Sequence, residues 1–276
     1  QFVYEKPNFN YSDNSLFTSL RSTSSDNITD FGYKSSDIGV SIGTAFEQFE
    51  NLYFRPELDI AYETLETTST ASKNLKKQEA DYFDAYFNYS FEYDQRNKKF
   101  RADEGYRNIF YQELPILSDN QELINSFETT RYQKFNEMIT KVSFYGKAVN
   151  TLDSKDVRIS KRLYIPSSKL RGFESGKIGP IENNDYIGGN YISAINFNAS
   201  LPQLFPSFQN VDFSLFFDAA NVWGVDYDKS IDDNSKIRSA TGVAMDLSTP
   251  VGPLNFSLSQ PITKSATDKT ESFRFN

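Results

Sequence analysis

The side chains that could do chemistry in this chain of 276 residues are carboxylates and arginines, because it has neither histidine nor cysteine. Without histidine the commonest general base and metal ligand is missing, and without cysteine there is no thiol nucleophile or disulfide. Four aspartates of one acidic segment raise the question of calcium binding: Asp226, Asp228, Asp232 and Asp233. This segment lacks the glycine and terminal glutamate of an EF-hand loop, so we interpret it as a solvated loop. The sequence predicts no enzyme activity, no metal site and no cofactor.

Charge and apolar patterning argue against two further classes of protein. The formal net charge is −8, whereas a nucleic-acid-binding protein would present a basic face. A membrane-spanning helix needs roughly 20 consecutive apolar residues, and no run of that kind is present. The sequence therefore predicts neither a nucleic-acid partner nor a transmembrane helix. A membrane β-barrel stays open, because its apolar band occupies only every second residue.

Apolar and aromatic residues recur at every second position through most of the chain. Between Phe83 and Tyr93, for example, aromatic residues alternate with mostly polar ones. Side chains alternate across a strand, so such a segment has one apolar and one polar face. We count about 13 such segments at ~20-residue spacing, which suits long membrane strands better than the ~8–12-residue spacing of a soluble β-sandwich. The pattern favours an all-β fold, an antiparallel transmembrane β-barrel.

The polar faces and the connections indicate how such a barrel would be arranged. The polar faces carry five carboxylates that a water-filled lumen would hold without partners: Asp84, Glu92, Asp212, Asp218 and Asp246. The connection at 248–253 is short, whereas those at 66–79 and 224–236 are long, as at the two ends of an outer-membrane barrel. The longest irregular stretch covers 159–190, and a stretch of that length is usually functional or disordered.

That irregular stretch contains Arg171-Gly172-Phe173, followed by Gly179-Pro180 and Gly188-Gly189-Asn190. It resembles the sixth extracellular loop of the BamA family, whose hallmark is an Arg-Gly-Phe turn. Three later segments are similar to strands of that family, in the same order: Phe216 to Trp223, Ile237 to Val243 and Pro250 to Pro261. Residues 93–107 are similar to an earlier strand–turn–strand unit. These matches cover about the last two-thirds of the chain.

The resemblance implies a barrel of 16 strands preceded by POTRA domains. Residues 1–276 would then be a partial C-terminal outer-membrane β-barrel with about 13 of those strands. The POTRA domains and the first strands would be absent, and the last strand would be clipped. Residues 159–190 would form a long loop folded into the lumen.

The resemblance also implies an outer-membrane protein insertase, which works mechanically and has no catalytic residues. Its first and last strands form a lateral seam, where incoming client strands pair with an exposed edge. The partners implied are unfolded outer-membrane β-barrel proteins, the lipid bilayer and accessory assembly lipoproteins. The location implied is the outer membrane of a Gram-negative bacterium, as an integral protein.

Six residues form the site that the resemblance implies. The loop motif is Arg171, Gly172 and Phe173, and its partners in the lumen would be Asp218, Asn198 and Phe216. If Phe217 faces lipid, then Asp218 faces the lumen, where a guanidinium could pair with its carboxylate. Asn198 stands where relatives often have an acid, so it could accept a hydrogen bond without neutralising Arg171. Gly172 would permit a tight turn, and Phe173 would pack on apolar groups such as Phe216.

Three other functions remain open on the sequence. The same superfamily includes TamA-like proteins and two-partner secretion translocators, which share the Arg-Gly-Phe type of loop. A passive porin or receptor barrel would use the loop only as a constriction. A soluble β-sandwich binding module would be extracted without detergent, which would exclude the membrane interpretation.

Overall fold

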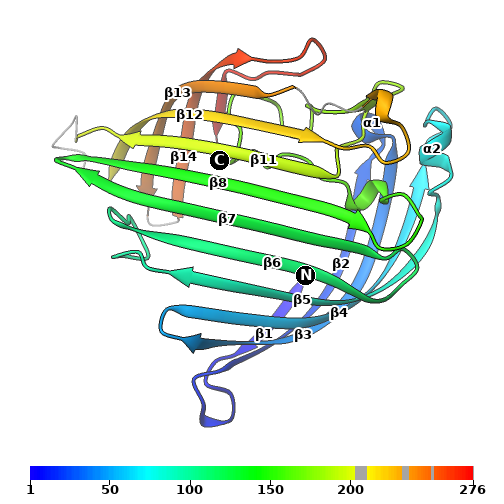
Figure 1. The fold of residues 1–276 in the computed structure, drawn as a ribbon, viewed down its shortest axis with the longest axis horizontal. Helices are drawn as coiled ribbons and strands as arrows, with labels where there is room; N and C mark the ends of the chain where they lie inside the picture. The colour runs from blue at the N-terminus through cyan, green and yellow to red at the C-terminus, as the bar shows by residue number, and fades with distance from the viewer. Residues whose placement is uncertain (203–209, 232–235, 250–251, 276) are drawn as a thin grey trace.

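Thirteen antiparallel strands follow one another round a single curved sheet in the computed structural model, which describes residues 1–202, 210–231, 236–249 and 252–275 (Figure 1). Each strand pairs with its neighbours in the chain, except that β8 pairs with β11 across a long insertion. In the described residues β1 and β15 lie at the two edges of the sheet. The predicted all-β antiparallel fold with about 13 strands is confirmed.

The strands of the sheet have the following bounds. The first eight are β1 (Phe2–Lys6), β2 (Ser15–Asn27), β3 (Tyr33–Phe49), β4 (Leu52–Thr67), β5 (Ala80–Asp94), β6 (Gly105–Ser118), β7 (Glu122–Phe135) and β8 (Met138–Thr151). The other five are β11 (Tyr191–Ser200), β12 (Val211–Trp223), β13 (Arg238–Thr249), β14 (Gly252–Thr263) and β15 (Phe273–Phe275). A separate two-stranded hairpin is formed by β9 (Ile181–Glu182) and β10 (Asp185–Tyr186).

Helices are few and short. They are η1 (Phe9–Tyr11), α1 (Ile28–Phe31), α2 (Lys73–Lys76), η2 (Ile159–Lys161) and η3 (Lys229–Ile231). Within the described ranges, none of the helices is both long and apolar enough to cross a membrane.

The two faces of the sheet differ as the alternation predicts. In β5, Asp84, Tyr86 and Asn88 are buried on the inner face, while Phe83 and Phe91 are exposed on the outer face. Neighbouring strands extend this outer apolar surface with Ile38, Val40, Ile42, Leu58, Ile60 and Tyr62. An outward apolar band of this kind is what a barrel presents to lipid.

Aromatic rings gather on the outer surface of β3 to β6, near the tight turn between β3 and β4. Phe54 stacks on Phe91 with ring centroids 4.6 Å apart and meets Phe46 edge-on at 5.6 Å. Tyr89 continues the group toward Phe110, at 6.2 Å between centroids. Phe and Tyr rings gathered near the ends of the strands match the aromatic girdle that a barrel presents at a membrane–water interface.

The two ends of the sheet carry different connections. At one end β3 joins β4, and β7 joins β8, through very short turns, although the longer connections 7–14 and 95–104 lie at this end as well. Residues 250–251, which fall in the predicted short turn and in the motif that begins at Pro250, lie outside the described residues. The opposite end carries α1, α2 and the longest connection (Figure 1).

That longest connection covers 152–190, between β8 and β11, and is called the infolded loop below. It begins seven residues before the predicted stretch of 159–190. A buried apolar cluster joins the infolded loop to the inner face of β7, β8 and β11 to β13; it includes Val157, Leu163, Ile165, Leu170, Phe173, Ile178, Val149, Ile192, Val222 and Ala240. A second cluster covers the end of the sheet that carries α1 and α2, and it includes Tyr33, Leu65, Leu75, Ile159, Ile187 and Val225.

The expectation that the inner carboxylates need no partners is wrong. Asp84 and Asp218 are buried and each is paired with an arginine of the infolded loop. Glu92 pairs with Arg107 on the neighbouring strand. The infolded loop packs against the inner face and buries Asp84 and Asp218, so these carboxylates require a compensating charge or hydrogen bonds.

Candidate functional site

The Arg-Gly-Phe turn lies inside the barrel, against the inner face of β12 to β14. Gly172 adopts φ +86°, in the left-handed region. A residue with a side chain is less stable than glycine in this conformation. A Cβ added there would lie 3.0 Å from Cβ of Ala240 and 3.2 Å from Cβ of Ser259. Both the backbone conformation and the close approach to the wall therefore favour glycine at this turn.

Arg171 makes a two-pronged ion pair with Asp218 on β12. Its Nε donates to Oδ2 at 2.7 Å, and its Nη2 donates to Oδ1 at 2.8 Å. Nη2 also donates to Oδ1 of Asn198 on β11 at 2.9 Å. The guanidinium carbon lies 3.6 Å from the centre of the Phe216 ring, within the range of a cation–π contact. The structure thus brings Arg171, Asp218, Asn198 and Phe216 together.

Asp218 is completely buried, and four donors satisfy its carboxylate. Besides the two guanidinium bonds, it accepts the backbone N–H of Arg171 at 3.1 Å and Nδ2 of Asn196 at 2.8 Å. Asn196 faces Asp218 across the β11–β12 ladder and also donates to the carbonyl of Lys169 at 2.8 Å. Sequence reasoning did not identify Asn196, although its place two residues before Asn198 puts both on the inner face.

Phe173 and Phe216 have different partners: Phe216 packs against the Arg171 guanidinium, and Phe173 belongs to an apolar cluster that does not include Phe216. The side chain of Phe173 is buried in the apolar cluster between the infolded loop and the wall. Its backbone forms an antiparallel bridge with Thr270, in the connection between β14 and β15. The motif therefore joins the barrel wall through Arg171 and the β14–β15 connection through Phe173.

A second arginine of the infolded loop was missed by sequence reasoning. Arg158 is buried and lies among three carboxylates from three strands. Its Nη2 donates to Glu122 Oε2 and to Asp84 Oδ2, both at 2.7 Å, and its Nη1 lies 3.3 Å from Glu63 Oε2. Burial lowers the pKa of this guanidinium, but the charges of Glu122 and Asp84 outweigh burial and raise the pKa above its ordinary value. Arg158 thus anchors the infolded loop to β4, β5 and β7, while Arg171 anchors it to β11 and β12.

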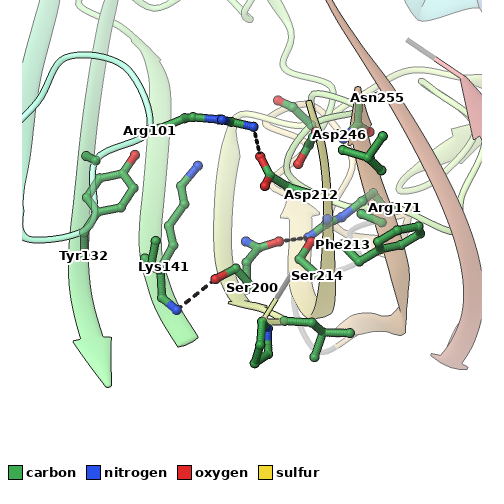
Figure 2. Close-up of a pocket in the computed structure, with 18 of the residues that line it drawn as sticks. Arg101, Tyr132, Lys141, Arg171, Ser200, Asp212, Phe213, Ser214, Asp246 and Asn255 are labelled. Carbon is green, nitrogen blue, oxygen red and sulfur yellow. Dashed lines mark hydrogen bonds and ion pairs between the residues drawn. The ribbon is translucent and has the colours of Figure 1, made fainter. Parts of the chain in front are cut away.

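A cavity of about 760 Å³ lies on the other side of Arg171, toward the end with the short turns. Figure 2 shows Arg171 and Lys141 at its wall, and Arg101 reaching from the 95–104 connection to form an ion pair with Asp212 on β12. The cavity carries charges of both signs. It preserves part of the polar lumen that the sequence predicts.

Nothing in the geometry of these groups suggests a resident metal. Among the residues the structure describes, no group of three or more acidic side chains is arranged to hold an ion. Two aspartates of the acidic segment, Asp232 and Asp233, lie outside the described residues. The paired groups of the site are suited to fixing the position of a loop.

We expect Gly172→Ala to destabilise the barrel by about 1–2 kcal/mol, because the alanine would need a left-handed backbone and would press on Ala240. Urea unfolding of the full-length protein in lipid vesicles measures this change. Gly146→Ala is the matched control, because the added Cβ would make only ordinary van der Waals contacts, with the Phe144 ring at 3.5 Å and the Ile192 carbonyl at 4.0 Å. Equal unfolding midpoints for the two variants would contradict the prediction.

Comparison with known proteins places the chain in a family. Residues 1–276 match the model of the Omp85 superfamily domain. The outer membrane protein assembly factor BamA of Neisseria meningitidis serogroup B is 30% identical over 140 residues, which cover 38% of this chain and 17% of that protein.

Solved structures agree on the fold. BamA from Haemophilus ducreyi lacking POTRA domains 1–3 superposes with a TM-score of 0.86 at 22% identity, over 99% of this chain and 60% of that one. CdiB from Acinetobacter baumannii superposes with a TM-score of 0.56 at 8% identity, over 95% of this chain and 45% of that one. The chain thus spans less than two thirds of the length of these relatives, and the resemblance to BamA proteins seen in the sequence is confirmed. The chain belongs to the Omp85 superfamily, whose members are integral outer-membrane proteins of Gram-negative bacteria.

Proposed function

We propose that this chain is the barrel of an outer-membrane protein insertase, which folds client β-barrels and inserts them through a lateral seam. The observation that carries the proposal is the braced infolded loop, held to the wall by the buried pair of Arg171 and Asp218. The name of the Neisseria relative, an outer membrane protein assembly factor, supports the same function. The clients would be unfolded outer-membrane β-barrel proteins, and the lipid bilayer would be the second partner.

The mechanism that we propose is mechanical. An incoming strand gains main-chain hydrogen bonds when it pairs with an exposed sheet edge, and the edge fixes its register. For that edge to serve as a template, the rest of the wall must keep its shape. The infolded loop provides this support, because Arg171 holds β11 and β12 while Arg158 holds β4, β5 and β7.

Asn198 has a smaller role in this proposal than Asp218. Its amide oxygen orients the guanidinium, but only the carboxylate of Asp218 neutralises it. Gly172 allows the left-handed turn, and the Phe216 ring makes a cation–π contact with the guanidinium. Phe173 fixes the turn in the apolar cluster. None of these residues is proposed to act as a catalyst.

The charge pair gives a direct test. We expect Arg171→Glu in the full-length protein to reduce insertion of a client barrel into vesicles by tenfold or more, about 1.4 kcal/mol, because two carboxylates would then face each other in a buried site. Adding Asp218→Arg should restore part of the activity, since the pair is re-formed with its charges exchanged. The yield of folded, protease-resistant client measures insertion.

Lys134→Glu serves as the control, because this exposed lysine lies at the end of β7, beside the turn to β8. The bracing role would be excluded if Arg171→Glu inserted clients as well as the unchanged protein did. If neither the unchanged protein nor Arg171→Glu inserted clients, and both exported a secreted substrate, the insertase would be replaced by the alternative of a two-partner secretion translocator. That alternative is retained because the chain shares its fold with CdiB.

We further propose that the complete protein carries POTRA domains ahead of this barrel and works with accessory assembly lipoproteins. Residues 1–276 would then be the C-terminal part, with the remaining strands of the barrel encoded upstream. The sequence of the complete gene tests the domain proposal, and copurification of the full-length protein in mild detergent tests the lipoproteins.

A passive porin would instead show a large, steady conductance that does not depend on the infolded loop.

A further inference from the structure

The connection between β14 and β15, residues 264–272, pairs with the infolded loop through its backbone. Glu271 N–H donates to the carbonyl of Gly172 at 3.2 Å, and Glu174 N–H donates to the carbonyl of Lys269 at 3.0 Å. Lys269 N–H donates in turn to the carbonyl of Lys177 at 3.1 Å. Together with the Phe173–Thr270 bridge, these bonds form a short ladder between two segments that are about a hundred residues apart in the chain.

One side chain of β15 extends this ladder into the strand itself. Arg274 is buried, and its Nη1 donates to the carbonyl of Ser167 at 2.7 Å. Its Nη2 donates to the carbonyl of Phe173, the last residue of the Arg-Gly-Phe turn. Its Nε forms an ion pair with Glu271, within the β14–β15 connection. The guanidinium therefore holds two points of the infolded loop that flank Arg171.

The position of Arg274 in its strand explains why it points inward. Phe273 and Phe275, on either side, are exposed on the outer face, and alternation places Arg274 on the inner face. On the ladder with β14, Arg274 lies opposite Ser257, which is buried. An arginine at this place can reach two carbonyls at once because its guanidinium carries five N–H donors in a fixed plane.

We infer that Arg274 is a positioning residue that couples β15 to the infolded loop, so that β15 and the Arg-Gly-Phe turn move as one unit. When Arg171 is held by Asp218, the carbonyls of Ser167 and Phe173 are fixed in place, and they in turn hold β15. When the turn leaves the wall, β15 loses two acceptors for a buried guanidinium and is released with it. This coupling holds the wall together and does not depend on the proposed insertase function.

The test measures the mobility of β15 rather than activity. Amide hydrogen exchange is followed in the full-length protein in lipid vesicles, on peptides that cover 264–275 and 167–178. We expect Arg274→Gln to speed exchange in both peptides by roughly tenfold or more. We also expect Arg171→Glu, which does not touch β15 directly, to speed exchange in 264–275 to a similar extent.

The combined variant decides whether the two arginines act through one connection. If they do, adding Arg171→Glu to Arg274→Gln should change exchange in 264–275 little further, whereas independent effects would multiply. Unchanged exchange in 264–275 on Arg171→Glu, or multiplying effects, would overturn the inference.

A second measurement covers the case in which Arg274→Gln does not fold. Arg274→Lys keeps the charge but replaces the planar fork by a single ammonium group, so it should fold and still weaken the hold on two carbonyls. A nitroxide spin label on Phe275→Cys, which faces outward, should then become more mobile, while a label on Phe217→Cys in β12 should not. Equal mobility of the Phe275 label in Arg274→Lys and in the parent protein would overturn the coupling, whatever the outcome of the insertion assay.

Discussion

Replacement of Arg158 by methionine should lower the free energy of unfolding by about 3–5 kcal/mol, because the change leaves buried carboxylates without their counter-charge. Glu122 is fully buried and Asp84 nearly so, and both accept hydrogen bonds from this guanidinium. Glu63 completes the group at 3.3 Å. The measurement is urea unfolding of the full-length protein in lipid vesicles, followed by the intrinsic fluorescence of its aromatic residues.

Arg21 provides a matched control on the same sheet. It too bonds two carboxylates, Asp37 and Asp59, but its side chain is 29% exposed, so water can replace the lost partner. Arg21→Met should therefore cost about 1 kcal/mol. Adding Glu122→Gln to Arg158→Met should recover part of the loss, since one uncompensated charge disappears. If Arg158→Met and Arg21→Met shifted the unfolding midpoint equally, burial would not be the reason for the effect.

The second large effect is expected at the pair formed by Arg238 and Asp268. Both side chains have no exposed surface, and the guanidinium bonds both carboxylate oxygens at 3.0 Å. Asp268→Leu should destabilise the protein by about 3–5 kcal/mol, because a buried guanidinium loses the carboxylate that accepts two of its charge-assisted hydrogen bonds. Arg238 also donates to Asn221 Oδ1 and to the carbonyl of Lys236, both at 2.9 Å.

The double variant Arg238→Met/Asp268→Leu should be more stable than Asp268→Leu alone. Apolar side chains of similar size often replace a buried ion pair at little cost, whereas removal of one partner does not. A cycle of the two single variants and the double variant in the unfolding assay separates these cases. A double variant as unstable as Asp268→Leu alone would show that the site needs its hydrogen bonds and not merely balanced charge. Lys98→Met, at an exposed pair with Asp103, should change stability by less than about 1 kcal/mol.

The strands could be predicted from the sequence because their signal is local. Alternation with a period of two is a property of consecutive residues, and each strand of this meander pairs with a neighbour in the chain. The inward direction of Asp218 followed from the same rule. The contact between Arg171 and Asp218 did not follow from any pattern, and only the resemblance to a family with an infolded loop suggested it.

The contacts that sequence reasoning missed share one physical cause, since they depend on where an irregular segment lies. Arg158 is one residue outside the stretch predicted to fold inward, and its three partners were interpreted as hydrated groups of an open lumen or were not singled out. Arg274 donates to two backbone carbonyls, and a carbonyl acceptor leaves no trace in the residue type at its position. The carboxylates on the inner faces of β4, β5 and β7 were the available signal, because so many acids facing one space require a cation in it.

The meander has a consequence for the order in which the molecule folds. Hairpins close over few residues and form early, whereas Arg158 meets Glu63 across 95 positions and Arg274 meets Phe173 across 101. These arginines can find their partners only after the wall has curved round the infolded loop. Until then the charges of these arginines remain hydrated and help to keep the unfolded chain soluble. Afterwards the same charges hold the infolded loop against the wall and β15. The arginines therefore act first as solubilising groups of the unfolded chain and last as bonds that fix the infolded loop.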